Sequence, residues 1–416
     1  MKNFIQKLSR LTVVVLLFGS VLPTRAAFTS LYVFGDGIST TTNNPSAGQY
    51  YYGLRRSNGR VWAEVLAQRL GLGANSITNA NWSNSSNNWS YYGQYSPNLV
   101  TNLNSFHTPS DAANALFIVW VNNADFVGDM GNIYPSLNIV TWTNAINQSL
   151  NNHWRVITNL YYAKGARTLI MPKAVDITET PQYDYYPAAS KSFIRQRVID
   201  FNVAFTTLIN QARTSLPGIT IYEPDFFALL DDVLVHASNY GLTNVLSSGQ
   251  SIDVLEDSLA NKSLNGPGAN YIFWDAVDPS AKLHEVMADV AQQIISPVQI
   301  AQITALAGSN RLNLANVPVG LNGSVEGSTN LALANWTAIT VTNGGTANIV
   351  TITSANTAQF VFVPTPPSWG VDTNNIVVSA NSGSTGGGIA PGPGGTVVVT
   401  ALQFYRLRFP YAWVWP

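Results

Sequence analysis

Residues 31–39 read Leu-Tyr-Val-Phe-Gly-Asp-Gly-Ile-Ser and decide the fold around them. Four apolar residues in a row, bounded by a glycine, predict a short buried strand. The acid that follows, Asp36, stands between two glycines, which predicts a turn. An acid directly after a buried strand is a candidate for a functional site, because sites in parallel sheets lie at the carboxyl ends of the strands.

The same pattern, an apolar run followed by a helical segment, recurs up to about residue 297. Strands are predicted at 115–121, 168–171 and 219–222, and helices at 61–67, 142–163, 192–212 and 279–295. Strands that alternate with long helices indicate a parallel sheet covered on both faces. We therefore predict an α/β domain over residues 27–298, with its site at the carboxyl edge of the sheet.

The character of the chain changes after Pro297. Residues 301–416 are rich in Val, Thr, Asn and Gly and carry little charge. Runs at 348–353 and 396–400 alternate as strands do, and the glycine- and proline-rich stretch 391–395 predicts a turn. We predict a separate all-β sandwich domain over residues 301–416.

Residues 1–26 have the pattern of a secretory signal peptide. Lys2 and Lys7 place positive charge near the N-terminus, and residues 11–18 are apolar. In the stretch 24–26, Thr24 and Ala26 supply small side chains at the cleavage positions. The apolar run is short for a membrane span, which needs about 20 residues. The alternative interpretation of this segment is an uncleaved anchor helix. We expect an exported protein, in the periplasm, at the cell surface or outside the cell, with no membrane span after cleavage.

Composition narrows the chemistry. The chain has 21 Lys and Arg against 22 Asp and Glu, and only 10% of its residues are charged, where about 25% is average. This balance excludes the basic face of a nucleic-acid binder. The chain has no cysteine, which excludes a thiol nucleophile and cysteine-ligated metals, and we expect no cofactor. A histidine-dependent mechanism has four candidates: His107, His153, His236 and His284.

Several short motifs follow one another in a set order. They are Phe-Gly-Asp-Gly at 34–37, Ser-Asn-Gly-Arg-Val-Trp at 57–62, Ile-Val-Trp-Val-Asn-Asn-Ala-Asp-Phe at 118–126, Gly-Ala-Arg at 165–167, Tyr-Gly-Leu-Thr-Asn-Val at 240–245 and Phe-Trp-Asp at 273–275. With these motifs, residues 28–297 resemble the GDSL (SGNH) lipases and esterases. The resemblance implies a three-layer α/β/α, flavodoxin-like parallel sheet and ester hydrolysis by a serine, a histidine and an aspartate.

The catalytic positions depart from the family pattern. The family's serine follows the first-block aspartate, and here that residue is Gly37. The last block is normally Asp-x-x-His-Pro, so Asp275 matches its aspartate and Asp278 stands at its histidine. A carboxylate with a pKa near 4 is a weak base and is not protonated at pH 7. Loss of nucleophile and base together costs on the order of 10⁶ in rate.

The positions that the resemblance implies for the oxyanion hole also differ. The third block normally reads Gly-x-Asn-Asp, and here Asn122 stands at its glycine and Ala124 at its asparagine, while Asp125 is kept. An alanine removes a side-chain donor, a loss of about 10²–10³ in rate in comparable cases. The second-block glycine has no firm counterpart, and Ser86 is the nearest candidate.

Other residues near these motifs offer alternatives. Ser39, two positions past the nucleophile point, is a candidate substitute nucleophile. Asp36, Asp275 and Asp278 are candidates for an oxygen-ligand cation site, for example for Ca²⁺. We favour the simpler interpretation, in which Asp36 caps its turn and Asp278 caps the last helix, and no metal is bound. None of the four histidines stands at the expected position.

Aromatic residues gather in predicted loops. They are Tyr50, Tyr51, Tyr52, Trp82, Trp89, Tyr91, Tyr92, Tyr183, Tyr185 and Tyr186. Flat apolar rings among Asn and Ser suit recognition of sugars or peptides. The alternative, equally open, is that the rings fill space where loops fold over the sheet.

Three functions follow from these features. The first is a non-hydrolytic relative, a pseudoenzyme that binds a ligand such as a carbohydrate or an acylated glycan at the former active-site mouth. The second is an active ester hydrolase with an unconventional site. The third is surface attachment through the β-domain, because the motifs at 327–331, 335–337 and 403–408 resemble a module appended to many exported bacterial proteins.

Overall fold

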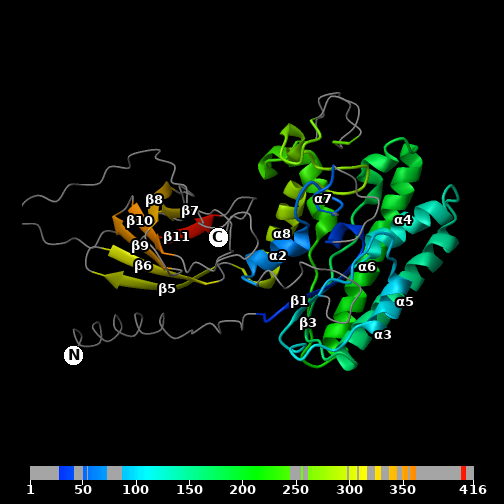
Figure 1. Cartoon of the computed structure of the whole chain (residues 1–416), viewed down its shortest axis with the longest axis horizontal. Helices are drawn as coiled ribbons and strands as arrows, with labels where there is room; N and C mark the ends of the chain where they lie inside the picture. The colour runs from blue at the N-terminus through cyan, green and yellow to red at the C-terminus, as the bar shows by residue number, and fades with distance from the viewer. Residues whose placement is uncertain are drawn as a thin grey trace, which may run out of the picture.

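The computed structural model describes residues 28–41, 50–53, 55–72, 87–243, 254–255 and 261–297, and the backbone of strands between residues 299 and 408. Its first sheet contains β1 (Leu31–Gly35), β2 (Leu116–Trp120), β3 (Thr168–Ile170) and β4 (Thr220–Tyr222), in the order β1-β2-β3-β4. Figure 1 labels β1 and β3 of this sheet. Each neighbouring pair is parallel. The predicted parallel α/β sheet is confirmed.

A further segment extends this sheet beyond β1. Asn88 forms a parallel bridge with Val33. The Val33 N–H donates to the Asn87 carbonyl at 2.8 Å, and the Trp89 N–H donates to the Val33 carbonyl at 2.7 Å. With this segment counted, the chain order across the sheet is 2-1-3-4-5, as in flavodoxin-like folds.

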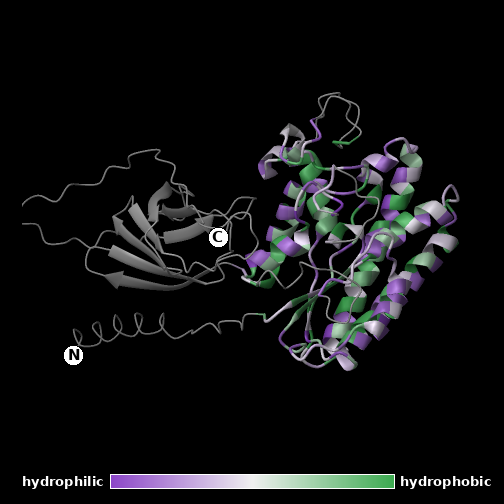
Figure 2. Ribbon diagram, viewed as in Figure 1, coloured by the Kyte–Doolittle hydropathy of each residue, from purple (hydrophilic) through white to green (hydrophobic). Residues whose placement is uncertain are grey.

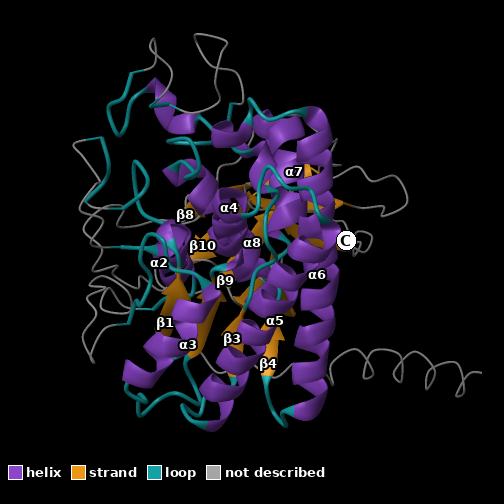
Figure 3. Cartoon of the chain, turned by 90° about the vertical axis from the view of Figure 1, so that its right-hand side faces the viewer, coloured by secondary structure: helices purple, strands orange, loops and turns teal. Residues whose placement is uncertain are grey.

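Helices cover both faces of the sheet. One face carries α3 (Ser96–Ser105), α4 (Asn122–Asn132), α5 (Ile139–Tyr162) and α6 (Ala188–Ser215), and the other carries α2 (Trp62–Arg69), α7 (Phe226–His236) and α8 (Ala281–Ile295). Figure 3 shows α3, α5 and α6 in front of the strands. Short 3₁₀ helices at Gly37–Ser39, Ile177–Glu179 and Pro181–Tyr183 lie in loops at the carboxyl edge of the sheet.

Strand β2 shows why both faces are covered. Phe117 and Val119 join the core beneath α3, α5 and α6, whereas Leu116, Ile118 and Trp120 join the core beneath α2, α7 and α8. Successive side chains of a strand point to opposite faces, so a strand buried on both sides reads as a continuous apolar run. Figure 2 shows hydrophobic residues concentrated on the inner sides of the helices.

The predicted helices are present, with bounds that differ by a few residues. The last one begins at Ala281 rather than 279, because the Ser280 hydroxyl accepts the Leu283 N–H at 3.3 Å and caps it. The expected helix cap at Asp278 was therefore wrong. Among the described helices, none is both long and apolar enough to cross a membrane. The predicted signal peptide, residues 1–26, lies outside the described residues.

The C-terminal strands form a second sheet in the order β11-β7-β8-β10-β9-β6-β5. They are β5 (Gln299–Leu306), β6 (Ser309–Ala315), β7 (Ser324–Ser328), β8 (Thr337–Asn343), β9 (Ile349–Ser354), β10 (Thr357–Val361) and β11 (Phe404–Arg408). The predicted strand at 348–353 corresponds to β9, whereas 396–400 lies outside the described residues. The sandwich arrangement of this region stays a prediction.

Candidate functional site

The turn after β1 places Asp36 and Gly37 at the carboxyl edge of the sheet. Asp36 caps the 3₁₀ helix Gly37–Ser39 and accepts the Ile38 N–H at 3.1 Å, so the predicted turn cap is confirmed. Burial raises the pKa of Asp36 to about 7, although hydrogen bonds from the backbone N–H groups of Ile38 and Ala124 oppose the effect. The Ala124 contact joins this turn to the first turn of α4.

Gly37 has no side chain, and the ring of Tyr92 lies over it. A Cβ on Gly37 would stand 3.0 Å from Tyr92 Cδ2, inside the usual carbon contact distance of about 3.5–4.0 Å. The turn with Tyr92 is anchored on β1, because the Tyr91 N–H and the Gln94 side-chain amide donate to the Gly35 carbonyl at 3.3 and 2.8 Å. A side chain at position 37 therefore requires Tyr92 to move.

Arg56 holds Tyr92 in this position. Its guanidinium carbon lies 4.1 Å from the centre of the Tyr92 ring and 5.7 Å from the centre of the Tyr51 ring. Arg56 Nη1 is 3.9 Å from Asp275 Oδ2, and the Tyr51 hydroxyl donates to the same oxygen at 2.7 Å. We refer to Tyr51, Arg56 and Tyr92 as the cover of Gly37.

Both carboxylate oxygens of Asp275 are engaged. Its Oδ1 accepts the Val277 N–H at 3.1 Å and the Asp278 N–H at 2.8 Å, while Oδ2 accepts the Tyr51 hydroxyl. In a catalytic triad this aspartate orients a histidine. Here Asp275 instead accepts hydrogen bonds from its own loop and from Tyr51 of the cover.

Asp278 stands at the histidine position as a buried acid. It is 3% exposed, and its Oδ2 has no hydrogen-bond partner among the described residues. Burial raises its pKa well above the ordinary value, and the negative charges of Asp275 and Asp36 add to this against the opposing charge of Arg56. The expectation of an ordinary pKa near 4 was therefore wrong, because it ignored burial. A protonated carboxyl group does not serve as a general base.

The carboxylates do not form a cation site. Within the described ranges, no group of three or more His, Cys, Asp or Glu residues is arranged to hold a metal ion. Asp278 is shifted toward its neutral form, and Asp275 is saturated by its own loop and Tyr51. The alternative interpretation of Asp36, Asp275 and Asp278 as a Ca²⁺ site was wrong.

The residues expected around an oxyanion hole serve to hold loops. The Asn122 side-chain amide donates to the Pro172 carbonyl at 2.9 Å, and Ala124 offers only its N–H, to Asp36. Asp125 accepts the Ser96 N–H at 2.8 Å and the Ser149 hydroxyl at 2.5 Å, which ties α4 to α3 and α5. The second-block candidate, Ser86, lies outside the described residues.

The structure places Ser39 and two of the histidines in the core. Ser39 is fully buried, and its hydroxyl accepts the Trp62 indole N–H at 3.0 Å, so it faces α2 rather than the site. His284 Nδ1 accepts the Trp62 backbone N–H at 3.2 Å, and burial lowers the pKa of this histidine to about 3. His153 is buried with its ring 5.2 Å from that of Phe205. Ser39 is therefore not an available nucleophile.

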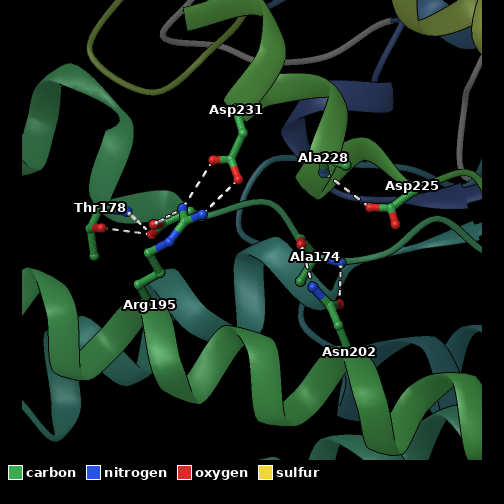
Figure 4. Close-up of polar contacts among 8 residues, drawn as sticks. Ala174, Thr178, Arg195, Asn202, Asp225, Ala228 and Asp231 are labelled. Atoms are coloured by element: carbon green, nitrogen blue, oxygen red, sulfur yellow. Dashed lines mark hydrogen bonds and ion pairs between the residues drawn. The ribbon is translucent and has the colours of Figure 1, made fainter. Parts of the chain in front are cut away.

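An ion-pair network fixes the loop after β3 (Figure 4). Arg195 of α6 donates to Asp176 Oδ2 at 2.8 Å and to both oxygens of Asp231 on α7 at 3.0 and 2.6 Å. Asp176 also accepts the N–H and hydroxyl of Thr178, which caps the 3₁₀ helix Ile177–Glu179. The network holds this loop against α6 and α7.

A narrow apolar cavity lies beside the turn that carries Gly37. Its volume is about 40 Å³, and since one water needs about 10–15 Å³ it has room for a few methyl-sized groups. Its lining comes from seven elements or loops and includes Ile38, Trp120, Asn123, Val175, Leu229, Val277 and Met287. Val277 lies between Asp275 and Asp278, so the cavity adjoins the loop that carries these two acids.

Tyrosines from two loops meet at the carboxyl edge. Tyr134 stacks on Tyr186 with ring centres 4.5 Å apart and an interplanar angle of 26°. Tyr183 and Tyr185 contact Tyr186 edge to face at 5.3 and 4.7 Å. We refer to Tyr134, Tyr183, Tyr185 and Tyr186 as the tyrosine cluster.

Some of the loop aromatic residues noted in the sequence are exposed, as ligand recognition requires, and others fill space in the core. Trp89 fills the core at 3% exposure, whereas Tyr185 is 79% exposed. Trp82 lies outside the described residues. The sequence did not single out Tyr134, which follows α4 some fifty residues before its partners; only the fold brings them together.

Comparison with known proteins places these features in a family context. A family model described as GDSL-like Lipase/Acylhydrolase matches residues 31–291. The GDSL esterase/lipase APG of Arabidopsis thaliana is 20% identical in an alignment 340 residues long, and this match covers 67% of this chain and 93% of that protein. A second GDSL esterase/lipase of Arabidopsis thaliana is 26% identical over 120 residues, 27% of this chain but only 31% of that protein. A solved lipase from a goat rumen metagenome aligns with a TM-score of 0.37 and 10% identity, over 63% of this chain and 95% of its own.

Proposed function

This chain belongs to the GDSL-like lipase/acylhydrolase family, and we propose that it is an exported, non-hydrolytic member that binds a carbohydrate or an acylated glycan. The ligand lies at the former active-site mouth, where the loops after the parallel strands converge. The cover over Gly37 is the observation that carries this proposal. A hydrolase needs room for a side chain at its nucleophile position, and here a Cβ on Gly37 would stand 3.0 Å from Tyr92 Cδ2.

The chemistry of the site supports loss of hydrolysis. Acyl transfer needs a nucleophile, a base within hydrogen-bond reach and donors for the oxyanion. Position 37 has no side chain, and position 278 carries a buried acid with a raised pKa. At the positions expected for oxyanion donors, the Asn122 amide donates to the Pro172 carbonyl and the Ala124 N–H donates to Asp36. Each of the three parts is therefore absent or assigned to another contact.

The shape of the mouth supports a glycan that carries a small acyl group. Exposed tyrosine rings offer flat apolar faces with a hydroxyl at the edge, a combination suited to sugar rings. The apolar cavity beside Ile38 admits a group of a few carbons, such as an acetyl substituent. A drug-sized ligand needs a pocket of roughly 300–1,000 Å³, so the main part of the ligand lies on the surface.

The test combines a catalytic assay with a binding assay on the full chain. Purified protein is incubated with p-nitrophenyl acetate and p-nitrophenyl butyrate, and its binding to an array of neutral, acidic and acetylated oligosaccharides is measured. We expect no turnover above the background of the Asp275→Ala variant, together with retention on a subset of glycans. Sustained turnover by the wild type, or no glycan binding, would overturn the proposal.

Ester hydrolysis is the second candidate function, because the curated relatives carry the name GDSL esterase/lipase. It requires a nucleophile other than position 37. Labelling of the wild type by a fluorophosphonate probe, with the modified residue located by mass spectrometry, would support it. No labelling, with labelling of an active family member in the same experiment, would exclude a serine mechanism.

Export is tested separately. Expression of the full chain in a bacterial host, fractionation and N-terminal sequencing are expected to give a mature protein that starts near residue 27, outside the cytoplasm. A chain that retains Met1 and stays in the cytoplasmic fraction would contradict the export part alone.

A further inference from the structure

The tyrosine cluster is built outward from the core of the α/β domain. Tyr183 is 3% exposed and sits at the base, and Tyr186 packs against it half-buried. Tyr134 and Tyr185 flank Tyr186, and Tyr185 is 79% exposed. Because each ring is fixed by the one below it, the outer rings need little further ordering when a ligand binds, which lowers the entropic cost of binding.

The cluster continues toward Gly37. Burial raises the pKa of Tyr183, and the neighbouring Tyr186, Tyr185, Tyr92 and Tyr95 add to the effect, so all five rings belong to one neighbourhood. Tyr95 and Tyr92 are 38% and 54% exposed. Tyr92 and Tyr95 are therefore two further exposed rings within electrostatic range of Tyr183.

One exposed carboxylate lies inside the cluster's loop. The side chain of Asp184 is 51% exposed, and Lys191 Nζ lies 3.8 Å from its Oδ1. A carboxylate repels an acidic polymer, and it accepts hydrogen bonds from hydroxyl groups.

We infer that the tyrosine cluster is the binding surface for a neutral oligosaccharide, whose ring faces stack on Tyr185 and Tyr134 and whose hydroxyls donate to Asp184. The inference rests on the proposed function and deepens it, since it names the class of glycan and the residues that hold it. Each ring of the cluster carries a hydroxyl group at its edge, and the flat face together with that hydroxyl suits a sugar ring.

The experiment is isothermal titration of the full chain with cellohexaose, xylohexaose and chitohexaose, and with hexagalacturonate as the acidic comparison. We expect binding of at least one neutral hexamer and none of hexagalacturonate. Tyr185→Ala is expected to weaken binding about tenfold, which corresponds to about 1.4 kcal/mol and lies within the range of an aromatic stacking contact. Tyr185→Phe keeps the stacking face and is expected to stay within about threefold of the wild type.

Tyr162→Ala is the matched control. Tyr162 is 72% exposed at the end of α5, where the chain enters β3, so it lies at the opposite edge of the sheet. Its removal is expected to leave the affinity unchanged. Circular dichroism of each variant checks that the fold is kept.

The outcomes separate this inference from the proposed function. A neutral hexamer that binds Tyr185→Ala as well as it binds the wild type would overturn the inference and leave a glycan-binding protein with a different surface. Stronger binding of hexagalacturonate would overturn the charge argument and with it the choice of ligand. If no neutral hexamer binds, the inference fails, and the proposed function fails with it only if the oligosaccharide array also shows no retention.

Discussion

The ring of Tyr92 lies over the Cα of Gly37, and a Cβ there would come within 3.0 Å of Tyr92 Cδ2. The lack of a side chain at position 37 and the placement of the Tyr92 ring are therefore complementary. Gly37 leaves room that Tyr92 uses, and Arg56 stacks on the other side of the ring at 4.1 Å. A serine at position 37 therefore requires Tyr92 to shift as well.

The first prediction concerns this pair. Gly37→Ser alone is expected to stay inactive and to lower the free energy of unfolding by about 1 kcal/mol, because the added atoms press on a filled site. The triple variant Gly37→Ser, Tyr92→Ala, Asp278→His restores a nucleophile, the space above it and a base beside Asp275. It is expected to label with a fluorophosphonate and to hydrolyse p-nitrophenyl acetate.

The matched control is Gly37→Ser, Tyr92→Ala, Asp278→Asn, which has the serine and the space but no base. It is expected to react at least 10²-fold more slowly than the triple variant, since a positioned base contributes about 10²–10⁴. Equal reactivity of the two triple variants, or activity of Gly37→Ser alone, would contradict the assigned roles.

The second prediction concerns the pH dependence of stability. Folded Asp278 keeps its proton to higher pH than in the unfolded chain, where an aspartate titrates near pH 4. The folded state then binds more protons, so its free energy of unfolding falls as the pH rises above about 4 toward the raised pKa. Asp278→Asn removes this contribution. The variant is expected to gain stability relative to the wild type between pH 5 and pH 7.5.

Urea midpoints at the two pH values check this expectation. In Asp278→Asn the fall of the unfolding free energy with pH is reduced rather than abolished. Asp36, with a pKa of about 7 in the folded state, contributes in the same direction. Asp200→Asn on α6, where the carboxylate is 46% exposed, is the control and is expected to leave the slope unchanged. A stability difference between Asp278→Asn and the wild type that is the same at both pH values would show that Asp278 is ionised at neutral pH.

The third prediction concerns the network around Arg195. Arg195→Met leaves Asp176, whose side chain is 1% exposed, without its cation. Breaking a fully buried pair costs about 3–5 kcal/mol, but the Arg195 side chain is 34% exposed and water screens part of the interaction. We expect a loss of about 2 kcal/mol in urea unfolding and faster amide exchange in α7. Arg195→Lys, which keeps the charge but not the paired geometry, is expected to lose less.

The sequence predicted the sheet well because its strands leave a strong signal. The β2 segment is a run of apolar residues buried on both faces, and such runs have few other interpretations. The edge segment at 87–91 gave no such signal, because it pairs through one bridge and carries Asn, Ser and Tyr. Tyr92 directly follows that segment. Because the segment was not predicted as part of the sheet, the position of Tyr92 against Gly37 was not predicted either.

The sequence also located Gly37, Asp275 and Asp278 but not their chemistry. Burial decides the state of Asp278, and burial of a loop residue depends on contacts distant in sequence. The engagement of Asp275 by Tyr51, 224 residues away, is likewise a property of the fold. The helix cap was misassigned to Asp278 because Asp and Ser are both good caps. Ser280 lies two residues further along the chain and directly precedes the helix.

The last prediction concerns the apolar cavity beside Ile38. Val277 lines it from the loop between the two aspartates, and Val277→Ile adds one methylene to an unfilled apolar space. Burial of a methylene contributes about 0.8 kcal/mol, so we expect a small rise in the midpoint of thermal unfolding. If the cavity receives an acyl substituent, the same change weakens binding of an acetylated oligosaccharide and leaves its deacetylated form unaffected. Val203→Ile, at a site 65% exposed on α6, is the control and is expected to change neither property. Equal effects on the two oligosaccharides would show that the acyl group lies elsewhere.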